Sequence, residues 1–449
     1  MAGIMKKNLD LEEMITHREL EGKRTSMTQR DASTQWHPYT QMKDFGIHLP
    51  VVSARGSRLF LEDGSFLIDA ISSWWVNLYG HGNPIIKQRL TQQFDQLDHV
   101  LFAGFTHPPA LELADRLLPL LPGMSRLFFS DNGSTAVEVA LKMALQYFWN
   151  RGEVDRRVIL AFENAYHGDT FGAMAAGGVG VFNQAFADML PKVIRIPVPL
   201  SEDDPQTFEA LEKIDLQTVA GFIYEPLVQG AGGMIRYDAD GLSRVMSEVH
   251  HAGGWCIADE VMTGFGRLDT FFASEVIEEK PDIICLSKGL TGGVLPMAIS
   301  AASERVYEGF LSNDRGKAFM HGHSFTANPM GCAAALAGLD LLNSGEIQRS
   351  RLSLIRQQAD FARSVMDHPN VEECFSMGTL LVIRLKRNRS SEVYDEFRDR
   401  VYALALANQV LLRPLGNVLY AMPPYTSTTE DLKIMYKGIR AILNNIAID

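Results

Sequence analysis

From about residue 122 onward, short apolar runs alternate with stretches in which apolar residues recur at helical spacing. The runs cover residues 126–130, 157–162, 193–197, 220–225, 255–261, 282–287 and 297–302. A run that is apolar throughout is typical of a strand buried on both faces, and intervening helices are typical of parallel pairing. The alternation therefore predicts an α/β domain built on a mainly parallel central sheet.

The pattern changes beyond about residue 345. Strand-like runs at 379–385 and 419–422 flank a helical stretch at 392–408, and a last helix opens at the capping-box pattern of residues 427–430. This mixed order of strands and helices predicts a second, smaller α+β unit.

Composition excludes several classes of protein. The chain has 449 residues, of which 46% are hydrophobic, and a formal net charge of −12, which argues against a nucleic-acid or anionic-membrane surface. No apolar stretch is long enough to span a membrane, and the N-terminus has no signal-peptide core. Cys256, Cys285, Cys332 and Cys374 lack C-x-x-C spacing and are interpreted as reduced thiols. We expect a soluble, cytoplasmic protein whose charge-dense first thirty residues form a solvated arm.

Lys288 ends an apolar run and enters a glycine-rich turn. An amine in that position can be partly desolvated, which lowers its pKa and makes it a nucleophile toward an aldehyde. A lysine that attacks an aldehyde suggests pyridoxal phosphate as the cofactor. The structural alternative is a lysine that extends from a strand end into solvent.

Asp259 ends the apolar run that precedes the run of Lys288. Ligands of parallel α/β sheets gather at the carboxyl ends of the strands, so both residues are expected at the same edge. A buried carboxylate needs a cationic partner, and a protonated pyridine nitrogen is one. The alternative is an aspartate that caps the next turn.

The segment Asp131-Asn-Gly-Ser-Thr135 follows a strand and opens a helix. Amides near Gly133, the hydroxyls of Ser134 and Thr135 and the helix dipole are suited to binding a phosphate. An ordinary Ser/Thr helix cap explains the pattern equally well. No complete G-x-G-x-x-G follows a strand, which argues against a dinucleotide site.

Two more segments carry aromatic and hydroxyl groups. Tyr166 stands next to His-Gly in an expected loop, where its ring can lie on a cofactor ring. The run Met320-His-Gly-His-Ser324 offers Gly322 and Ser324 as phosphate donors. Its two histidines lack a third ligand at fitting spacing, so no metal site is predicted.

Taken in order, these motifs resemble one family. Asn132-Gly-Ser, Tyr166-His-Gly, Asp259-Glu-Val-Met-Thr-Gly-Phe-Gly-Arg267, Lys288-Gly and His321-Gly-His-Ser are similar to the class III aminotransferases, fold-type-I pyridoxal-phosphate enzymes, over nearly the whole chain. The resemblance implies a large domain with a mainly parallel sheet and a smaller α+β domain formed by both ends of the chain. The expected divisions are an arm at 1–33, the small domain at 34–85 and 346–449, and the large domain at 86–345.

The resemblance also implies roles at the cofactor. Lys288 would hold pyridoxal 5'-phosphate covalently and then move a proton, Asp259 would keep the pyridine nitrogen protonated, and Tyr166 would stack on the ring. Residues expected to contact the phosphate end are Gly133, Ser134, His323 and Ser324. In the family the last of these comes from the partner subunit, which implies a homodimer with shared active sites.

Within the family, Trp36-His-Pro-Tyr39, Ser72-Ser-Trp-Trp75, Tyr166-His-Gly-Asp-Thr-Phe-Gly172 and Leu412-Arg-Pro-Leu-Gly416 resemble the members that act in biotin synthesis. These transfer an amino group from S-adenosyl-L-methionine to 8-amino-7-oxononanoate by ping-pong transamination. The expected substrate-binding residues are Tyr39, Trp74, Tyr166, Gly322, Lys288 and Arg413, with Arg413 on the substrate carboxylate and Arg267 and Asp169 in supporting places.

The resemblance leaves the amino donor open. His323-Ser324 resembles relatives that use L-lysine, whereas Tyr39, Trp74 and Tyr420 favour adenosylmethionine, because aromatic walls suit an adenine. A broader ω-amine:pyruvate transaminase is a further alternative. A binding or scaffold protein without catalytic activity is the reading that the motifs favour least.

Overall fold

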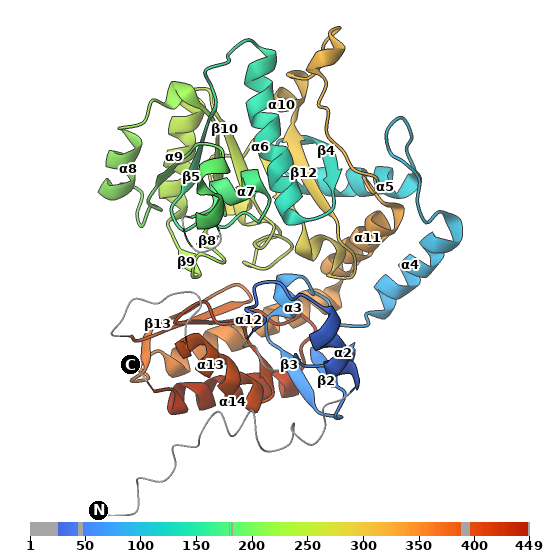
Figure 1. Ribbon diagram of the computed structural model, residues 1–449, viewed down its shortest axis with the longest axis vertical. Coiled ribbons are helices and arrows are strands. Elements are labelled where there is room, and N and C mark those ends of the chain that lie inside the picture. The colour runs from blue at the N-terminus through green and yellow to red at the C-terminus, as the bar shows by residue number, and fades with distance from the viewer. Residues whose placement is uncertain (1–25, 44–47, 179, 181–182, 388–395, 448–449) are drawn as a thin grey trace, which may run out of the picture.

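The computed structural model describes residues 26–43, 48–178, 180, 183–387 and 396–447. Most of the charged arm predicted for residues 1–33 lies outside these residues, and its last part forms helix α2 (Ser26–Thr34). The described chain forms two lobes, and the strands of the N-terminal segment lie beside the C-terminal elements in the lower lobe (Figure 1).

A seven-stranded sheet forms the centre of the larger lobe. Its strands, in spatial order, are β4 (Met124–Ser130), β12 (Ala298–Ser303), β11 (Ile283–Leu286), β10 (Trp255–Asp259), β7 (Val219–Tyr224), β5 (Val158–Phe162) and β6 (Val193–Ile196). Strand β12 is antiparallel to both neighbours, and the other adjacent pairs are parallel. The prediction of a mainly parallel α/β sheet is confirmed, and each predicted run overlaps one strand, with ends that differ by a few residues.

Both faces of this sheet are covered by helices. Along β10, Trp255 and Ile257 join the apolar cluster of α6 (Gly133–Asn150). Cys256 and Ala258, which point to the other face, join the cluster of α9 (Ala239–His251). Alternate side chains are therefore buried on opposite sides, and this explains why the strands are apolar throughout. The remaining elements of this lobe are α5 (Pro108–Leu117), α7 (Phe171–Ala176), α8 (Pro205–Leu211), β8 (Val228–Gln229), β9 (Ile235–Arg236), α10 (Glu304–Glu308) and α11 (Pro329–Asn343).

The smaller lobe joins the two ends of the chain. Its first sheet has the order β1 (Val51–Arg55), β2 (Arg58–Leu61), β3 (Phe66–Asp69) and β15 (Val410–Leu411), and its second has β13 (Val371–Met377), β14 (Leu380–Leu385) and β16 (Val418–Ala421). Parallel pairing of β3 with β15, with Ile68 opposite Val410, ties the N-terminal segment to the C-terminal one. The expected small α+β lobe is thus present, while the residue boundaries of the two domains stay a prediction.

Helices α12 (Gly345–Val365), α13 (Glu396–Ala407) and α14 (Thr429–Asn445) belong to this lobe, and α4 (Pro84–Gln96) extends to α11 of the larger one (Figure 1). The cap of α14 is Thr428, whose hydroxyl accepts the Asp431 N–H at 3.1 Å, one residue later than predicted. No described helix is long and apolar enough to cross a membrane.

Candidate active site

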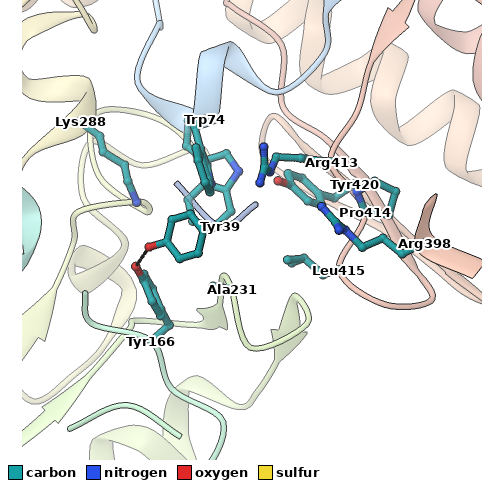
Figure 2. A pocket seen from close by; sticks show the side chains of 11 residues that line it. Tyr39, Trp74, Tyr166, Ala231, Lys288, Arg398, Arg413, Pro414, Leu415 and Tyr420 are labelled. Atoms are coloured by element: carbon teal, nitrogen blue, oxygen red, sulfur yellow. Dashed lines mark hydrogen bonds between the residues drawn. The ribbon is translucent and has the colours of Figure 1, made fainter. Parts of the chain in front are cut away.

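A cavity of about 260 Å³ lies where the two lobes meet (Figure 2). Its walls come from distant parts of the sequence: Tyr39, Trp74, Trp75, Tyr166, Ala231, Lys288, Arg398, Arg413, Pro414, Leu415 and Tyr420. The structure thus brings together five of the residues predicted from sequence, namely Tyr39, Trp74, Tyr166, Lys288 and Arg413. An amine lies at one end of this cavity, guanidiniums lie at the other, and aromatic rings lie between them.

Lys288 extends into the cavity from the carboxyl end of β11. It is the first residue of a single 3-10 turn, and its φ of 44° is left-handed. Its Nζ lies 4.4 Å from the centre of the Trp75 ring. Desolvation lowers the pKa of this amine to about 8, although Asp259 and Glu225 act in the opposite direction. A larger fraction of the amine is therefore neutral and nucleophilic near neutral pH than in an ordinary lysine.

Asp259 ends β10, the parallel neighbour of β11, and lies behind the cavity wall. It is buried, and its Oδ2 is bonded to Nδ1 of the buried His167 at 2.7 Å. Its Oδ1 accepts the Val261 N–H at 3.1 Å. These bonds satisfy and orient a carboxylate that is too buried to be solvated by water.

Tyr166 and Tyr39 meet across the cavity. Their hydroxyl oxygens lie 3.1 Å apart, and both hydroxyls donate hydrogen bonds to Oδ2 of Asp169. Burial raises the pKa of Tyr166, and the neighbouring Tyr39 and Asp169 raise it further. Tyr166 therefore stays protonated over the ordinary pH range, and both phenols present hydrogen-bonding groups on an aromatic wall.

Trp74 and Trp75 stand on a turn with unusual backbone geometry. All four residues of α3 (Ser72–Trp75) have positive φ, with values of 51°, 46°, 71° and 75°. A left-handed conformation costs roughly 1–2 kcal/mol for each residue other than glycine. Strain of this kind persists only where the surrounding structure enforces it, and it is concentrated at functional sites.

Bonds from both segments of the smaller lobe hold this turn. The buried Asp69 accepts the Ser73 N–H at 2.8 Å and the Ser73 hydroxyl at 2.7 Å, and His81 Nε2 lies 2.9 Å from it. The Ser72 hydroxyl donates to the Met422 carbonyl at 2.7 Å. As a result, Trp75 faces Lys288 while Trp74 faces Arg413, whose guanidinium carbon lies 4.4 Å from the centre of its ring.

Arg267 is fully buried and lies behind this turn. Its guanidinium donates to the carbonyls of Trp75 at 3.2 Å, Met422 at 3.3 Å and Pro423 at 3.4 Å. It therefore joins the larger lobe to both segments of the smaller one. In this chain Arg267 does not line the cavity.

The predicted phosphate loop at 320–324 lies elsewhere. Gly322 and Ser324 are exposed, and neither of them nor His323 lines the cavity. The His323 N–H donates to the Thr326 hydroxyl at 3.1 Å, and neighbouring His321 contacts Lys142 at 2.9 Å. One chain alone therefore does not bring this loop to the amine.

Sequence reasoning missed several residues that support the site. His167 and Glu225 are buried beside Asp259, and Glu225 accepts the N–H groups of Tyr166 at 3.0 Å and Gly230 at 2.8 Å. Burial raises the pKa of Glu225 to about 7, although His167 acts in the opposite direction. The sequence did carry a signal for Glu225, because this residue ends an apolar run as Asp259 does. Arg398 gave no such signal, because it stands among charged residues of a helix.

A family model for class-III aminotransferases matches residues 39–443. The chain belongs to the class III aminotransferases. Among curated relatives, the adenosylmethionine-8-amino-7-oxononanoate aminotransferase of Synechococcus elongatus is 46% identical, covering 92% of this chain and 98% of the relative. The protein of that name from Geobacter sulfurreducens is 36% identical, covering 92% and 96%.

Solved structures agree with this family assignment. The adenosylmethionine-8-amino-7-oxononanoate aminotransferase of Methanocaldococcus jannaschii has a TM-score of 0.87 at 31% identity, covering 93% of this chain and 98% of that one. A PLP-bound amine transaminase from an uncultivated Pseudomonas species has a TM-score of 0.86 at 29% identity, covering 92% and 99%. Class III aminotransferases depend on pyridoxal phosphate, and so does this enzyme.

The residues of this class III aminotransferase fit that cofactor. The desolvated amine of Lys288 suits the aldehyde, and the buried carboxylate of Asp259 suits a pyridinium nitrogen. A Cβ added at Gly133 would lie 2.7 Å from the Val261 side chain, so this turn packs directly against the segment that follows Asp259.

At the phosphate end, α6 begins at Gly133 with Asn132 as its cap. The hydroxyl of Ser134 is bonded to Thr170, and that of Thr135 is bonded within the capping box. This turn offers an anion its backbone N–H groups and the helix dipole, and the role of the Ser134 hydroxyl at the phosphate stays a prediction.

Proposed function

We propose that this aminotransferase moves the amino group of S-adenosyl-L-methionine to 8-amino-7-oxononanoate, forming 7,8-diaminononanoate for biotin synthesis. One observation carries the proposal: the cavity places a desolvated amine and a guanidinium at opposite ends of an aromatic-walled space. The acceptor has its carbonyl and its carboxylate at opposite ends of an aliphatic chain, and that arrangement matches. The names of the relatives at 46% and 36% identity support the same substrates.

Pyridoxal phosphate, when bound, accepts the electron pair released at the substrate carbon and carries the amino group between the two half-reactions. Lys288 Nζ is the base that takes the proton from the donor carbon in the first half-reaction, and it gives a proton to the acceptor carbon in the second. The lowered pKa of this amine lets it act both as base and as acid. Asp259 holds a proton on the ring nitrogen, and His167 fixes its orientation.

The other residues bind and orient. Arg413 pairs with the acceptor carboxylate, and its stacking on Trp74 fixes its plane. Tyr166 would stack on the ring of the bound cofactor, and Gly133 and Ser134 would hold its phosphate at the start of α6. The ring of Tyr39 lies 5.3 Å from that of Trp74 at an angle of 62°. Tyr39 packs against the adenine of the donor.

The aromatic rings favour adenosylmethionine over lysine. Tyr39, Trp74 and Tyr420 surround the space between the two ends, and Tyr420 packs edge-on against Trp75 at 5.9 Å. An adenine gains stacking energy from such walls, whereas the short aliphatic chain of lysine gains little.

The enzyme is proposed to act as a cytoplasmic homodimer with shared sites. The loop that carries Gly322, His323 and Ser324 is flanked by strongly exposed apolar side chains, with Met320 at 75% and Phe325 at 63%. Exposed apolar residues next to expected phosphate donors suit a surface covered by a second copy. Ser324 of each copy then completes the phosphate site of the other.

Paired half-reactions test the substrates. Purified holoenzyme is mixed in parallel with S-adenosyl-L-methionine, L-lysine and a simple diamine, and the change in cofactor absorbance is followed in a single turnover. The aminated enzyme is then mixed with 8-amino-7-oxononanoate or with pyruvate. We expect that, of the three donors, only adenosylmethionine aminates the cofactor. We expect that, of the two acceptors, only 8-amino-7-oxononanoate takes the amino group back. Equal conversion by lysine reassigns the donor, and efficient use of the diamine and pyruvate contradicts the proposal.

A further inference from the structure

Two guanidiniums, not one, occupy the end of the cavity away from Lys288 (Figure 2). Arg413 follows β15, and Arg398 comes from the first turn of α13. The two side chains thus enter from separate elements. Nothing in the proposed function gives Arg398 a role.

The charge of the cavity is unusual for this chain. Among the described residues that line it are three basic side chains, those of Lys288, Arg398 and Arg413, and no carboxylate. The whole chain, by contrast, carries a formal net charge of −12. Arg398 forms an ion pair with Asp399 at 3.4 Å, and that carboxylate is 72% exposed. An ion pair so exposed contributes little to stability.

The fields of the two arginines overlap. Burial raises the pKa of both Tyr402 and Tyr420, and in each case Arg413 and Arg398 together oppose the rise. Both guanidiniums therefore act on the same region, which includes the wall residue Tyr420. A single anion bound there is attracted by two cations.

We propose that Arg398 is a specificity-determining residue that binds the carboxylate of the amino acceptor together with Arg413. This inference rests on the proposed function, which it deepens. A carboxylate has two oxygens with about four lone-pair positions, so it can accept hydrogen bonds from two guanidiniums. Arg413 is held flat on Trp74, and Arg398 approaches from α13. An acceptor with its carboxylate at the far end of an aliphatic chain reaches this pair, whereas an uncharged analogue gains nothing from it.

The test compares charged and uncharged acceptors on the holoenzyme. Wild type, Arg398→Gln and Arg398→Lys are assayed for kcat/KM with 6-oxohexanoate and 8-oxooctanoate, and with hexanal and octanal. The matched control is Arg400→Gln, because Arg400 lies on the same helix, packs on Phe397 at 5.7 Å and does not line the cavity. Cofactor absorbance verifies that each variant is loaded.

We expect the preference of wild type for oxo acids over aldehydes to fall about tenfold or more in Arg398→Gln, to recover in part in Arg398→Lys and to stay within about twofold in the control. Equal losses for acids and aldehydes, or an unchanged preference, overturn the inference. If wild type prefers oxo acids but does not convert 8-amino-7-oxononanoate, the proposed function fails while the role of Arg398 stands.

Discussion

Lys288 Nζ lies 4.4 Å from the centre of the Trp75 ring. The face of an indole attracts a cation, so this contact favours the ammonium form, whereas desolvation favours the neutral amine. Desolvation is the larger effect, and the pKa of the amine lies at about 8. The ring therefore fixes the direction of the side chain without preventing its loss of a proton.

The first prediction concerns the pH dependence of cofactor capture. The rate at which cofactor-free protein takes up pyridoxal phosphate should rise about tenfold per pH unit up to about pH 8 and then level off, because only the neutral amine reacts. Stopped-flow absorbance measures this rate. Lys288→Ala should abolish covalent attachment, and the exposed Lys433→Ala serves as control. A rate that keeps rising toward the pKa of an ordinary lysine would contradict the assignment.

The second prediction concerns Asp259. Asp259→Asn removes the negative charge opposite the ring nitrogen, so kcat should fall by roughly 100-fold or more while the cofactor stays bound through Lys288. The absorbance of the bound cofactor should shift as the ring nitrogen loses its proton. His167→Asn keeps the carboxylate and removes its 2.7 Å partner, so a smaller loss is expected. Equal losses in the two variants would show that the effect is structural.

The third prediction separates substrate binding from cofactor binding. Arg413→Ala should raise the KM for 8-amino-7-oxononanoate by roughly 10- to 100-fold, because a charge-assisted pair with the carboxylate is lost. Cofactor affinity, measured by equilibrium dialysis, should change by less than about twofold. A parallel loss of cofactor affinity would place Arg413 in the structural support of the lobe instead.

The fourth prediction concerns the strained turn. Asp69→Ala leaves the Ser73 N–H and His81 without their buried acceptor, so the free energy of unfolding should fall by about 2–4 kcal/mol. Because Trp74 and Trp75 move together, the KM of both substrates should rise. Urea unfolding and steady-state kinetics test this, with the exposed Glu62→Ala as control. Lost stability with unchanged KM values would refute the link between turn and cavity.

The fifth prediction concerns stability and pH. Burial lowers the pKa of His250, but the hydrogen bonds and charges of Asp282 and Glu279 outweigh this effect and raise it above the ordinary value. The folded state thus binds the proton more tightly, and this stabilisation is complete below about pH 6.5 and is lost as pH rises through the folded pKa.

Accordingly, the difference in unfolding free energy between wild type and His250→Gln should shrink from about pH 6 to about pH 9. The change should be about 1.4 kcal/mol for each unit by which the pKa of His250 in the folded state exceeds that in the unfolded state. The neighbouring His251, whose ring contacts the Ser247 carbonyl at 2.8 Å, provides the control His251→Gln. A difference that grows with pH would reverse the sign of the argument.

Periodicity in the sequence was sufficient to predict the sheet and the meeting of Lys288 with Asp259. Both residues end fully buried strands, and neighbouring parallel strands end at one edge, so no long-range information was needed. The placement of Tyr39, Trp74 and Arg413 in one cavity followed from the family resemblance, because their local sequence carries no comparable pattern.

Other features had no local signal. Four left-handed residues that include two tryptophans contradict backbone preference, and bonds with Asp69, Met422 and Arg267 help to hold them in place. Arg398 follows a glutamate and a phenylalanine in a charged helix, where sequence favours a solvated face. The bonds that the turn makes with Met422 and Arg267 join residues more than 100 apart in the chain, and contacts of this kind are invisible in a single sequence.

The left-handed turn places Trp75 at the amine and Trp74 at the guanidiniums through adjacent peptide units. The two ends of the cavity consequently share one mechanical support. Any insertion, or any substitution that lets residues 72–75 relax to a right-handed path, displaces both walls in the same event. Diversification of acceptor range in descendants of this enzyme should therefore accumulate at side chains facing the cavity, such as Leu415 and Arg398, while the length and handedness of this turn stay fixed.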